Sequence, residues 1–419
     1  MINQIKVDFD KIINNLKLSK DNIDLRKKNL NDFIKKGFPN RRIEDWKFSD
    51  LNQIISSNIK DLRFFNEDLI PKSTQEPLLI DALSDKIFKH NKIAVVNGII
   101  ESIDFDYEEV NKIEIIDTNE TESLNLANPL VSLNTAFISN YLKITIKKGY
   151  SLKKPLIIYN ITNKKLRSTL INQRLDIVLE ENSSLKLINL FTHYSKDNFI
   201  NINHQFKLGK DAILKNYKID DKLNTNIKYF FNNIELNKNS VAESFILSMG
   251  SKFAKHEIVC NLNEKYSSAF INGVIKLNDA RHHEIKTNVN HLAENTKSYQ
   301  LIKSVLDDKS KSVYQGKIYV SPDAQKTDGY QLSKCILLDK NTEFNAKPEL
   351  EIYADDVKCS HGSASGSLNE NSIFYLRSRG LNYKQAKKLL ISGFFLDVIE
   401  KITDEEIKNF IKKIMELNQ

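Results

Sequence analysis

Leu175-Asp176-Ile177-Val178-Leu179 is the stretch of sequence that decides the fold. Large apolar side chains fall at every second position, Leu175, Ile177 and Leu179, as in a β-strand that buries one face. The polar turn Glu180-Glu181-Asn182-Ser183 follows, and a second apolar stretch comes after the turn. Similar junctions between a strand and a turn recur at intervals of 29, 28, 26 and 27 residues, at Leu179, Leu208, Leu236, Leu262 and Val289.

This repeat is made of strands and lacks helical stretches. Such a period predicts a solenoid, in which each coil buries its inward side chains against the coils above and below it. A two-sheet sandwich also contains many short strands, but it does not need so even a repeat. The repeat therefore favours a mainly β protein with a β-helix core.

Both ends of the chain have helical patterns. Near the amino terminus, apolar residues recur at helical spacing, at Ile5, Phe9, Ile12, Ile13 and Leu16. Trp46, the only tryptophan, is expected to anchor the core of this small helical unit. The strand pattern stops after about residue 365, and a helix is predicted from Tyr383 onward. We therefore predict an N-terminal helical region over 1–70, a β-helix core over 71–366 and a C-terminal helical region over 367–419.

The last predicted helix has one apolar side. Thr403-Asp404-Glu405-Glu406 is typical of a helix start, because acidic residues favour the first turn. The stripe that follows consists of Ile407, Phe410, Ile411, Ile414 and Met415. Such a stripe most often packs on its own domain. Docking of an external partner is the alternative interpretation.

Composition excludes several classes of protein. The 419 residues include 62 Lys and Arg against 54 Asp and Glu, and the excess is spread along the chain. No basic run is interleaved with aromatic residues, so no nucleic-acid partner is expected. The three cysteines are too few and too far apart for a disulfide framework, which favours a reducing compartment. No apolar run reaches the roughly 20 residues that span a bilayer, and no signal-peptide pattern is present. We therefore expect a cytoplasmic protein that does not contact a membrane.

Cys359 and His361 are the candidate chemical groups. Two residues apart on an extended strand, their side chains point to the same face. A thiolate beside an imidazole suits soft or borderline metals such as iron or zinc. Two ligands cannot complete a tetrahedral site, so other ligands must come from elsewhere in the chain or from another chain. A buried structural cysteine beside a hydrogen-bonded histidine is the alternative.

Other motifs give weaker signals. His282 and His283 together with His291 could suggest a metal cluster, but neighbours on a strand point to opposite faces, so at most one of the pair could join His291. The glycine-rich segment Gly362–Gly366 lacks the spacing of a nucleotide-binding loop. No Rossmann fingerprint, nucleophile elbow or HExxH helix occurs. The sequence thus has no catalytic signature, and we predict that the protein is not an enzyme.

Several motifs in the second half of the chain are recognisable. They are Gly316–Val320, Ala324–Asp328, Pro348–Ile352, Ala354–Gly366 and Ile373–Gly380. The first three resemble the G-x-I-x-V, A-Q-x-T-D and P-x-L-E-I elements of the SufB/SufD family of iron–sulfur cluster assembly proteins. The other two closely resemble the carboxy-terminal signature of that family. Gly37–Pro39 and Glu44–Phe48 are similar to its G-x-P and E-x-W-K-[FY] elements.

Within this family the chain resembles the SufD branch. Gly362 follows His361, whereas the SufB branch usually has glutamate after that histidine. The SufB branch also has a cluster-assembly cysteine just before the P-x-L-E-I strand. The corresponding stretch here, Asp339–Glu343, contains no cysteine. The resemblance therefore implies that this chain does not act alone as the main scaffold.

The resemblance implies a right-handed parallel β-helix flanked by helical ends. It implies a heterodimer with a SufB-like paralogue, in which each subunit binds one copy of the ABC-type ATPase SufC. His361, and less directly Cys359, are implied to face the SufB interface, where an iron–sulfur cluster or iron is held transiently. No cofactor is expected to stay bound to this chain alone.

The resemblance also places SufC docking in the C-terminal helices. The implied docking residues are Tyr383, Ala386, Leu389, Leu390, Phe394 and Phe395. It raises the partner interpretation of the apolar stripe in the last helix above packing on its own domain.

Two other functions stay open at this point. A β-helix carbohydrate-active enzyme needs paired acids in a groove, and Asp355-Asp356 is the one tempting pair, although neighbours on a strand diverge. A SufB-like homodimeric scaffold, or a homodimer of the isolated chain, is the other alternative.

Overall fold

The computed structural model describes residues 2–69, 87–124, 126–220 and 223–417. Its helical elements are α1 (Ile2–Asn15), α2 (Lys20–Lys36), η1 (Glu44–Trp46), α3 (Leu51–Asn58), η2 (Glu67–Leu69), η3 (Val110–Lys112), α5 (Pro129–Phe137), α6 (Glu370–Ser378), α7 (Tyr383–Ile399) and α8 (Glu405–Ile414).

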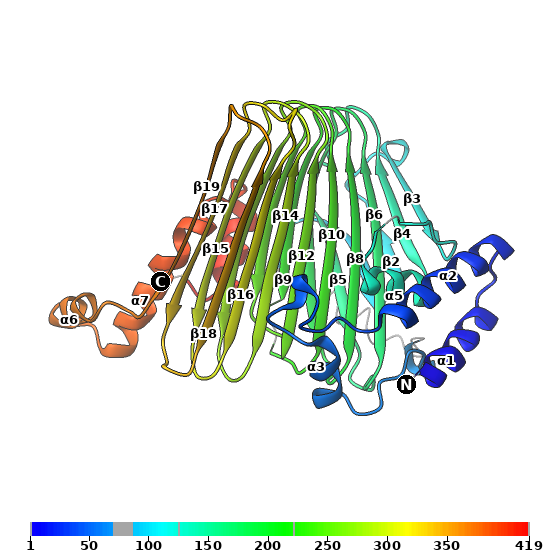
Figure 1. The fold of residues 1–419 in the computed structure, drawn as a ribbon, viewed down its shortest axis with the longest axis horizontal. Helices are drawn as coiled ribbons and strands as arrows, with labels where there is room; N and C mark the ends of the chain where they lie inside the picture. Colours follow the sequence, from blue (N-terminus) through cyan, green and yellow to red (C-terminus); the bar gives the residue numbers. More distant parts are fainter. Residues whose placement is uncertain (1, 70–86, 125, 221–222, 418–419) are drawn as a thin grey trace.

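The strands form two long sheets that face each other (Figure 1). Sheet 1 has the order β19-β17-β15-β13-β11-β9-β7-β5-β1-β2, and its strands are β1 (Asn91–Val96), β2 (Ile99–Asp104), β5 (Leu156–Thr162), β7 (Ser184–His193), β9 (Ile213–Asp220), β11 (Val241–Ser248), β13 (Ser268–Leu277), β15 (Lys297–Leu306), β17 (Asp328–Leu337) and β19 (Lys358–Gly366). Sheet 2 has the order β18-β16-β14-β12-β10-β8-β6-β4-β3, and its strands are β3 (Ile113–Thr118), β4 (Tyr141–Ile146), β6 (Leu170–Leu179), β8 (Phe199–Leu208), β10 (Ile227–Leu236), β12 (Phe253–Leu262), β14 (His282–His291), β16 (Lys311–Val320) and β18 (Glu343–Ile352).

Alternate strands of the chain pair in parallel, so each sheet gains one strand per coil. This is the stacked parallel β-solenoid that the repeat predicts. Within the described residues, only β2 on β1 and β3 on β4 pair antiparallel, and these strands end both sheets at the start of the solenoid. The predicted limit between residues 70 and 71 lies outside the described residues, whereas the last strand ends at Gly366 and α6 begins at Glu370.

The turns between strands contain the polar residues that separate the apolar runs of the sequence. In many of these turns one residue adopts the left-handed conformation, which asparagine and aspartate tolerate better than most residues. These residues include Asn182, Asp211, Asn239, Asp279, Asn295 and Asp308, with φ between 56° and 59°. The backbone N–H of Asn182 donates to the carbonyl of Lys210 in the next coil, and Asp211 does the same to Lys238. The turns therefore stack in register with the strands.

Two sequence predictions within the solenoid are wrong. The junctions at Leu179, Leu208, Leu236 and Leu262 are strand ends, but β14 continues past Val289 to His291, which is the register partner of Leu262. His291 can be buried at the end of β14 because its two ring nitrogens hydrogen-bond to the hydroxyls of Thr296 and Ser298 at 2.7 and 2.9 Å.

The second correction is a helix where only strands were predicted. α5 begins after the N-cap Asn128, whose side chain accepts from the N–H groups of Leu130 and Val131, and Pro129 occupies its first turn. All but one of its nine residues are buried, because the helix lies between α2 and the outer side of sheet 2. A helix that is buried on all sides lacks the one-sided apolar pattern that signals a surface helix.

The N-terminal segment packs on the outer face of sheet 2 and is not a separate helical unit (Figure 1). Trp46 is buried, as expected, but its ring lies 5.8 Å from the ring of Tyr229 on β10. The Lys255 ammonium of β12 lies 4.5 Å from the Trp46 ring and donates to the carbonyl of Asp45 at 2.8 Å. The tryptophan therefore fastens this segment to the solenoid.

The C-terminal helices α7 and α8 cover the outer face of sheet 1. Ile407, Ile411 and Met415 of the apolar stripe are at most 2% exposed and pack against strand residues such as Tyr217 and Phe245. The stripe therefore packs on its own solenoid, and the partner interpretation of this stripe is wrong. Among the described residues, no helix is both long and apolar enough to cross a bilayer.

Candidate functional site

In the part of the chain that the structure describes, no further coil stacks on the last coil of the solenoid. All ten residues of β18 and all nine of β19 are exposed or half-buried, although both strands pair in register with the preceding coil. We call the inward sides of these two strands the open end. In Figure 1 they form the edge of the solenoid farthest from β2 and β3.

The two strands of the open end differ in chemistry. The inward side of β18 continues the buried row of β16 and is apolar, with Phe344, Ala346, Pro348, Leu350 and Ile352. The inward side of β19 continues the buried row Gly329, Gln331, Ser333 and Cys335 of β17. It is polar, with Cys359, His361, Ser363 and Ser365. The open end thus has apolar side chains on β18, and thiol, imidazole and hydroxyl groups on β19.

Cys359 and His361 lie on the same side of β19, as their spacing predicts. Cys359 is half-buried against an apolar cluster that includes Ile318 and Ala354, and His361 is exposed. Burial raises the pKa of the Cys359 thiol, and a hydrogen bond from the Gly329 backbone partly offsets this effect. Coordination of a soft metal would favour the thiolate.

The other two thiols are not available to ligands. Cys260 and Cys335 point into the solenoid, at 1% and 4% exposure, and burial raises the pKa of each to about 12. Cys359 is therefore the cysteine that an external group can reach.

The described residues contain no cluster of three or more His, Cys, Asp or Glu side chains that could hold a metal. His283 and His291 both face inward on β14, but eight residues separate them, about 27 Å along a strand. His283 is held by the Ser248 hydroxyl and the Ser251 carbonyl, both at 2.8 Å. The donors at the open end, one thiol and one imidazole, suit iron but cannot enclose it.

The acidic pair has a different setting from the one expected. Asp355 and Asp356 lie in the bend between β18 and β19, not on a strand, and both are exposed. The backbone N–H of Asp356 donates to the Gln325 side chain at 3.0 Å.

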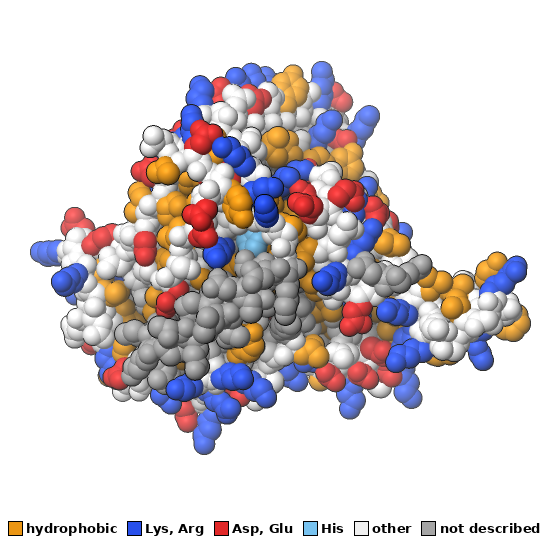
Figure 2. Space-filling model, turned by 180° about the vertical axis from the view of Figure 1, so that it is seen from behind, with side chains coloured by type: hydrophobic (Ala, Val, Ile, Leu, Met, Phe, Trp, Pro, Cys, Tyr) orange, Lys and Arg blue, Asp and Glu red, His pale blue; other side chains and the backbone are white. Residues whose placement is uncertain are grey.

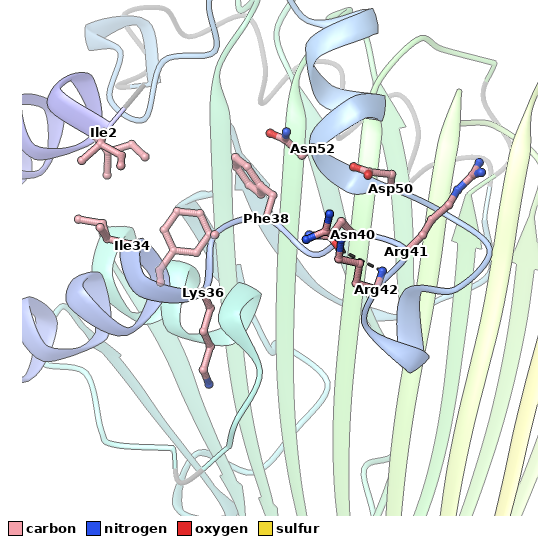
Figure 3. Close-up of a pocket in the computed structure, with 12 residues that line it drawn as sticks. Ile2, Ile34, Lys36, Phe38, Asn40, Arg41, Arg42, Asp50 and Asn52 are labelled. Atoms are coloured by element: carbon pink, nitrogen blue, oxygen red, sulfur yellow. Dashed lines mark hydrogen bonds between the residues drawn. The ribbon is translucent and has the colours of Figure 1, made fainter.

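A cavity of about 570 Å³ lies among α1, the end of α2 and the segment before α3 (Figure 3). Its lining includes Phe38, Arg42 and Asp50, but no thiol or imidazole. The Asp50 carboxylate caps α3 by accepting from the Gln53 N–H at 2.9 Å. This cavity therefore offers no soft metal ligand.

The implied docking residues on α7 differ in accessibility. Tyr383 and Leu389 are exposed, Leu390 and Phe394 are half-buried, and Ala386 and Phe395 are fully buried. Sequence reasoning missed Phe374 and Tyr375 of α6, which are 74% and 57% exposed. α6 projects from the body of the molecule, and Figure 2 shows orange hydrophobic side chains on this lobe. Two adjacent aromatic residues in a recognisable motif were the signal that could have found them.

Comparison with known proteins identifies the family. Residues 160–394 match the model of the family described as SUF system FeS cluster assembly, SufBD core domain. The iron–sulfur cluster assembly protein SufD of Escherichia coli (strain K12) is 26% identical over 388 residues, which cover 90% of this chain and 89% of that protein. The protein ABCI7, chloroplastic, of Arabidopsis thaliana is 24% identical over 89% of this chain and 81% of its own length. Because the family match covers more than half of its length, the chain belongs to the SufBD core family of the SUF system for iron–sulfur cluster assembly.

Proposed function

We propose that this chain is a non-catalytic scaffold subunit of an iron–sulfur cluster assembly complex. It pairs through its open end with a SufB-like paralogue and binds a SufC-like ATPase through its C-terminal helices. A nascent cluster or iron is the cargo held transiently between the two scaffold subunits.

The observation that carries this proposal is the open end. A solenoid needs a cap at each end, because its terminal coil otherwise exposes apolar side chains and unpaired backbone groups. The start of the solenoid has antiparallel strands there, whereas no described strand pairs with the far edges of β18 and β19. A second solenoid presented end-on can supply the missing apolar and backbone partners.

The two free edges are not equally suited to strand pairing. β18 contains Pro348, which lacks a backbone N–H and so interrupts a ladder of hydrogen bonds. β19 contains no proline, and its outward residues Ser360, Gly362 and Ala364 are small. A partner strand can therefore approach β19 closely, which supports pairing beside Cys359 and His361.

The chemistry of the open end supports cargo binding that depends on the partner. Cys359 and His361 offer two of the donors that an iron site needs, and a partner must provide the others. The family resemblance places a cysteine on the SufB side. The cargo would then sit between the subunits, where both chains control its release.

The C-terminal helices connect the proposed ATPase surface to the solenoid. Phe374, Tyr375 and Tyr383 form the exposed aromatic end, whereas Phe395 at the other end of α7 is buried against sheet 1. Lys303 of β15 pairs with Asp397 of α7, and its ammonium donates to the Phe394 carbonyl at 2.7 Å. Nucleotide-driven motion of an ATPase bound at the aromatic end would therefore be transmitted to β15 and toward the open end.

The test is co-expression of this chain with its organism's SufB-like and SufC-like proteins, followed by native mass measurement. We expect a particle with one SufB-like chain, two SufC-like chains and one copy of this chain. In that particle His361→Ala is expected to abolish cluster formation, while Ser363→Ala on the same inward side of β19 leaves it intact. A chain that purifies alone and ignores both partners contradicts the proposal.

A further inference from the structure

A column of three polar side chains leads along the inside of sheet 1 to the open end. Gln300 on β15, Gln331 on β17 and His361 on β19 are successive register partners, so their side chains stack about 4.8 Å apart along the solenoid. Gln331 is fully buried and Gln300 is 1% exposed. Below them in the same column lies Ile271 on β13, so the polar character begins two coils before the open end.

A tyrosine from the opposite sheet fixes the two amides. The Tyr314 hydroxyl lies 3.0 Å from Gln300 Oε1 and 3.3 Å from Gln331 Oε1, and Thr287 Oγ1 lies 3.3 Å from the same hydroxyl. Tyr314 is itself 1% exposed. Because the hydroxyl lies against both amide oxygens, these oxygens face the inside of the solenoid.

Gly316 makes this arrangement sterically feasible. A Cβ atom at this position would lie 2.1 Å from Gln331 Oε1 and 2.5 Å from the Tyr314 hydroxyl. Any other residue at 316 would separate the tyrosine from the amide. The glycine of the G-x-I-x-V motif therefore preserves a polar contact beneath the open end.

The orientation of Gln331 is fixed at both ends of its amide. Its oxygen faces Tyr314, and its Nε2 donates to the Glu349 carbonyl of β18 at 3.4 Å. An amide oxygen has two lone pairs, and contact with Tyr314 uses one. The second is available to the adjacent side chain of the column, His361, whose exposed ring makes no hydrogen bond in the structure and would turn toward the amide to donate to it.

We propose that Gln331 is a positioning residue for His361. Its amide oxygen accepts the N–H of one imidazole nitrogen, so the other nitrogen presents its lone pair to the open end. Metal-binding histidines commonly have such an acceptor behind the ring, because it fixes both the tautomer and the ring orientation. This inference rests on the proposed function only for its consequence in cluster assembly, since the histidine tautomer is a property of the isolated chain.

The test is ring-nitrogen NMR of His361 in the isolated full chain, at a pH where the imidazole is neutral. We expect one dominant tautomer in the wild type and in Gln331→Glu, which keeps an acceptor oxygen, and a mixture in Gln331→Leu. The control is Ser333→Ala, which removes the 3.1 Å contact between Ser333 and Ser363 on the same two strands but outside this column. If Gln331→Leu does not fold, Tyr314→Phe loosens the amide while it keeps the ring, and a partial mixture is expected.

Identical tautomer signals in the wild type and in folded Gln331→Leu or Tyr314→Phe overturn the proposal. In the assembled complex, Gln331→Leu is expected to weaken iron retention about 10- to 100-fold, as loss of an acceptor behind a ligand does elsewhere. If His361→Ala has no effect on cluster formation, the proposed function fails, but the NMR comparison still decides whether Gln331 positions His361.

Discussion

The middle of the solenoid and its last coil use strands of the same length and register, yet they differ in what covers them. Nine of the ten residues of β8 are buried, whereas none of the ten residues of β18 is. In the middle, neighbouring coils lie on both sides, and the N-terminal segment covers the outer face of sheet 2. Strands with the same backbone arrangement therefore differ in burial, because what packs against each strand decides whether its side chains are buried.

Charged side chains show the same contrast. Lys255 and Glu284 in the middle form an ion pair at 2.5 Å and are at most 1% exposed. Burial alone raises the pKa of Glu284, but Lys255 and His282 outweigh it and lower this pKa to about 2. On the outward side of β18, Lys347 pairs with Glu349 at 2.7 Å and also with Glu44, and these side chains are 22%, 44% and 66% exposed. Removing one partner should therefore be costly only in the middle.

The largest effect is expected from breaking the buried pair. Glu284→Ala leaves the Lys255 ammonium without its carboxylate in a desolvated site, which should lower the free energy of unfolding by about 3–5 kcal/mol. The matched change Glu349→Ala removes one exposed carboxylate, and Lys347 keeps its pair with Glu44, so the change should cost at most about 1 kcal/mol. Denaturant unfolding of both variants measures the difference. Equal losses would mean that cover does not distinguish the two regions.

Acid should destabilise the middle through its histidines. Burial lowers the pKa of His283 to about 4, below the roughly 6.5 of an unfolded chain. Between these values the unfolded state binds the proton and the folded state does not, so stability falls as the pH drops from about 6.5 toward 4. The slope is about 1.4 kcal/mol per pH unit for each such group.

Variants at the two regions test this slope. His283→Gln removes the titrating group and should make the loss of stability between pH 7 and pH 5 smaller. Ser363→Ala changes a residue without a titrating group at the open end and should leave the slope unchanged. Unfolding curves at both pH values are the measurement, and a slope that stays the same in His283→Gln contradicts this account.

The smallest effect on stability is expected at the projecting helix α6. Phe374 is 74% exposed, so Phe374→Ala should change the free energy of unfolding by less than about 0.5 kcal/mol. If α6 docks the ATPase, the same change should weaken binding of the SufC-like protein by about 2 kcal/mol, or roughly 30-fold. Tyr107→Ala, an exposed aromatic residue elsewhere, is the control. Unchanged binding in a calorimetric titration would exclude Phe374 from the contact.

The sequence predicted the solenoid because each coil repeats a local signal, an apolar residue followed by a polar turn. The predicted end of β14 was wrong at His291. Histidine is a polar residue, and only its hydrogen bonds to Thr296 and Ser298 explain why it is buried here. Asn128 and Pro129 are residues typical of a helix start, but they lie between stretches with a strand pattern, so α5 was not predicted.

The candidate site was only partly predictable. Alternation along a strand placed Cys359 and His361 on one side, and this rule needs no knowledge of the rest of the fold. The column of Gln300 and Gln331 behind His361 depends on pairing between residues about 30 positions apart, which alternation along one strand does not reveal. An apolar stripe such as that of α8 likewise does not say whose surface it covers, and here Ile411 packs on its own solenoid.

The uncovered last coil also has a consequence for the supply of subunits. A free sheet edge with an apolar wall can recruit any exposed strand, including those of misfolded chains, and so can seed aggregates. If the proposed pairing holds, copies made in excess of the SufB-like partner would carry this hazard. We then expect the abundance of the chain to follow that of the partner, through matched synthesis or through proteolysis of the surplus.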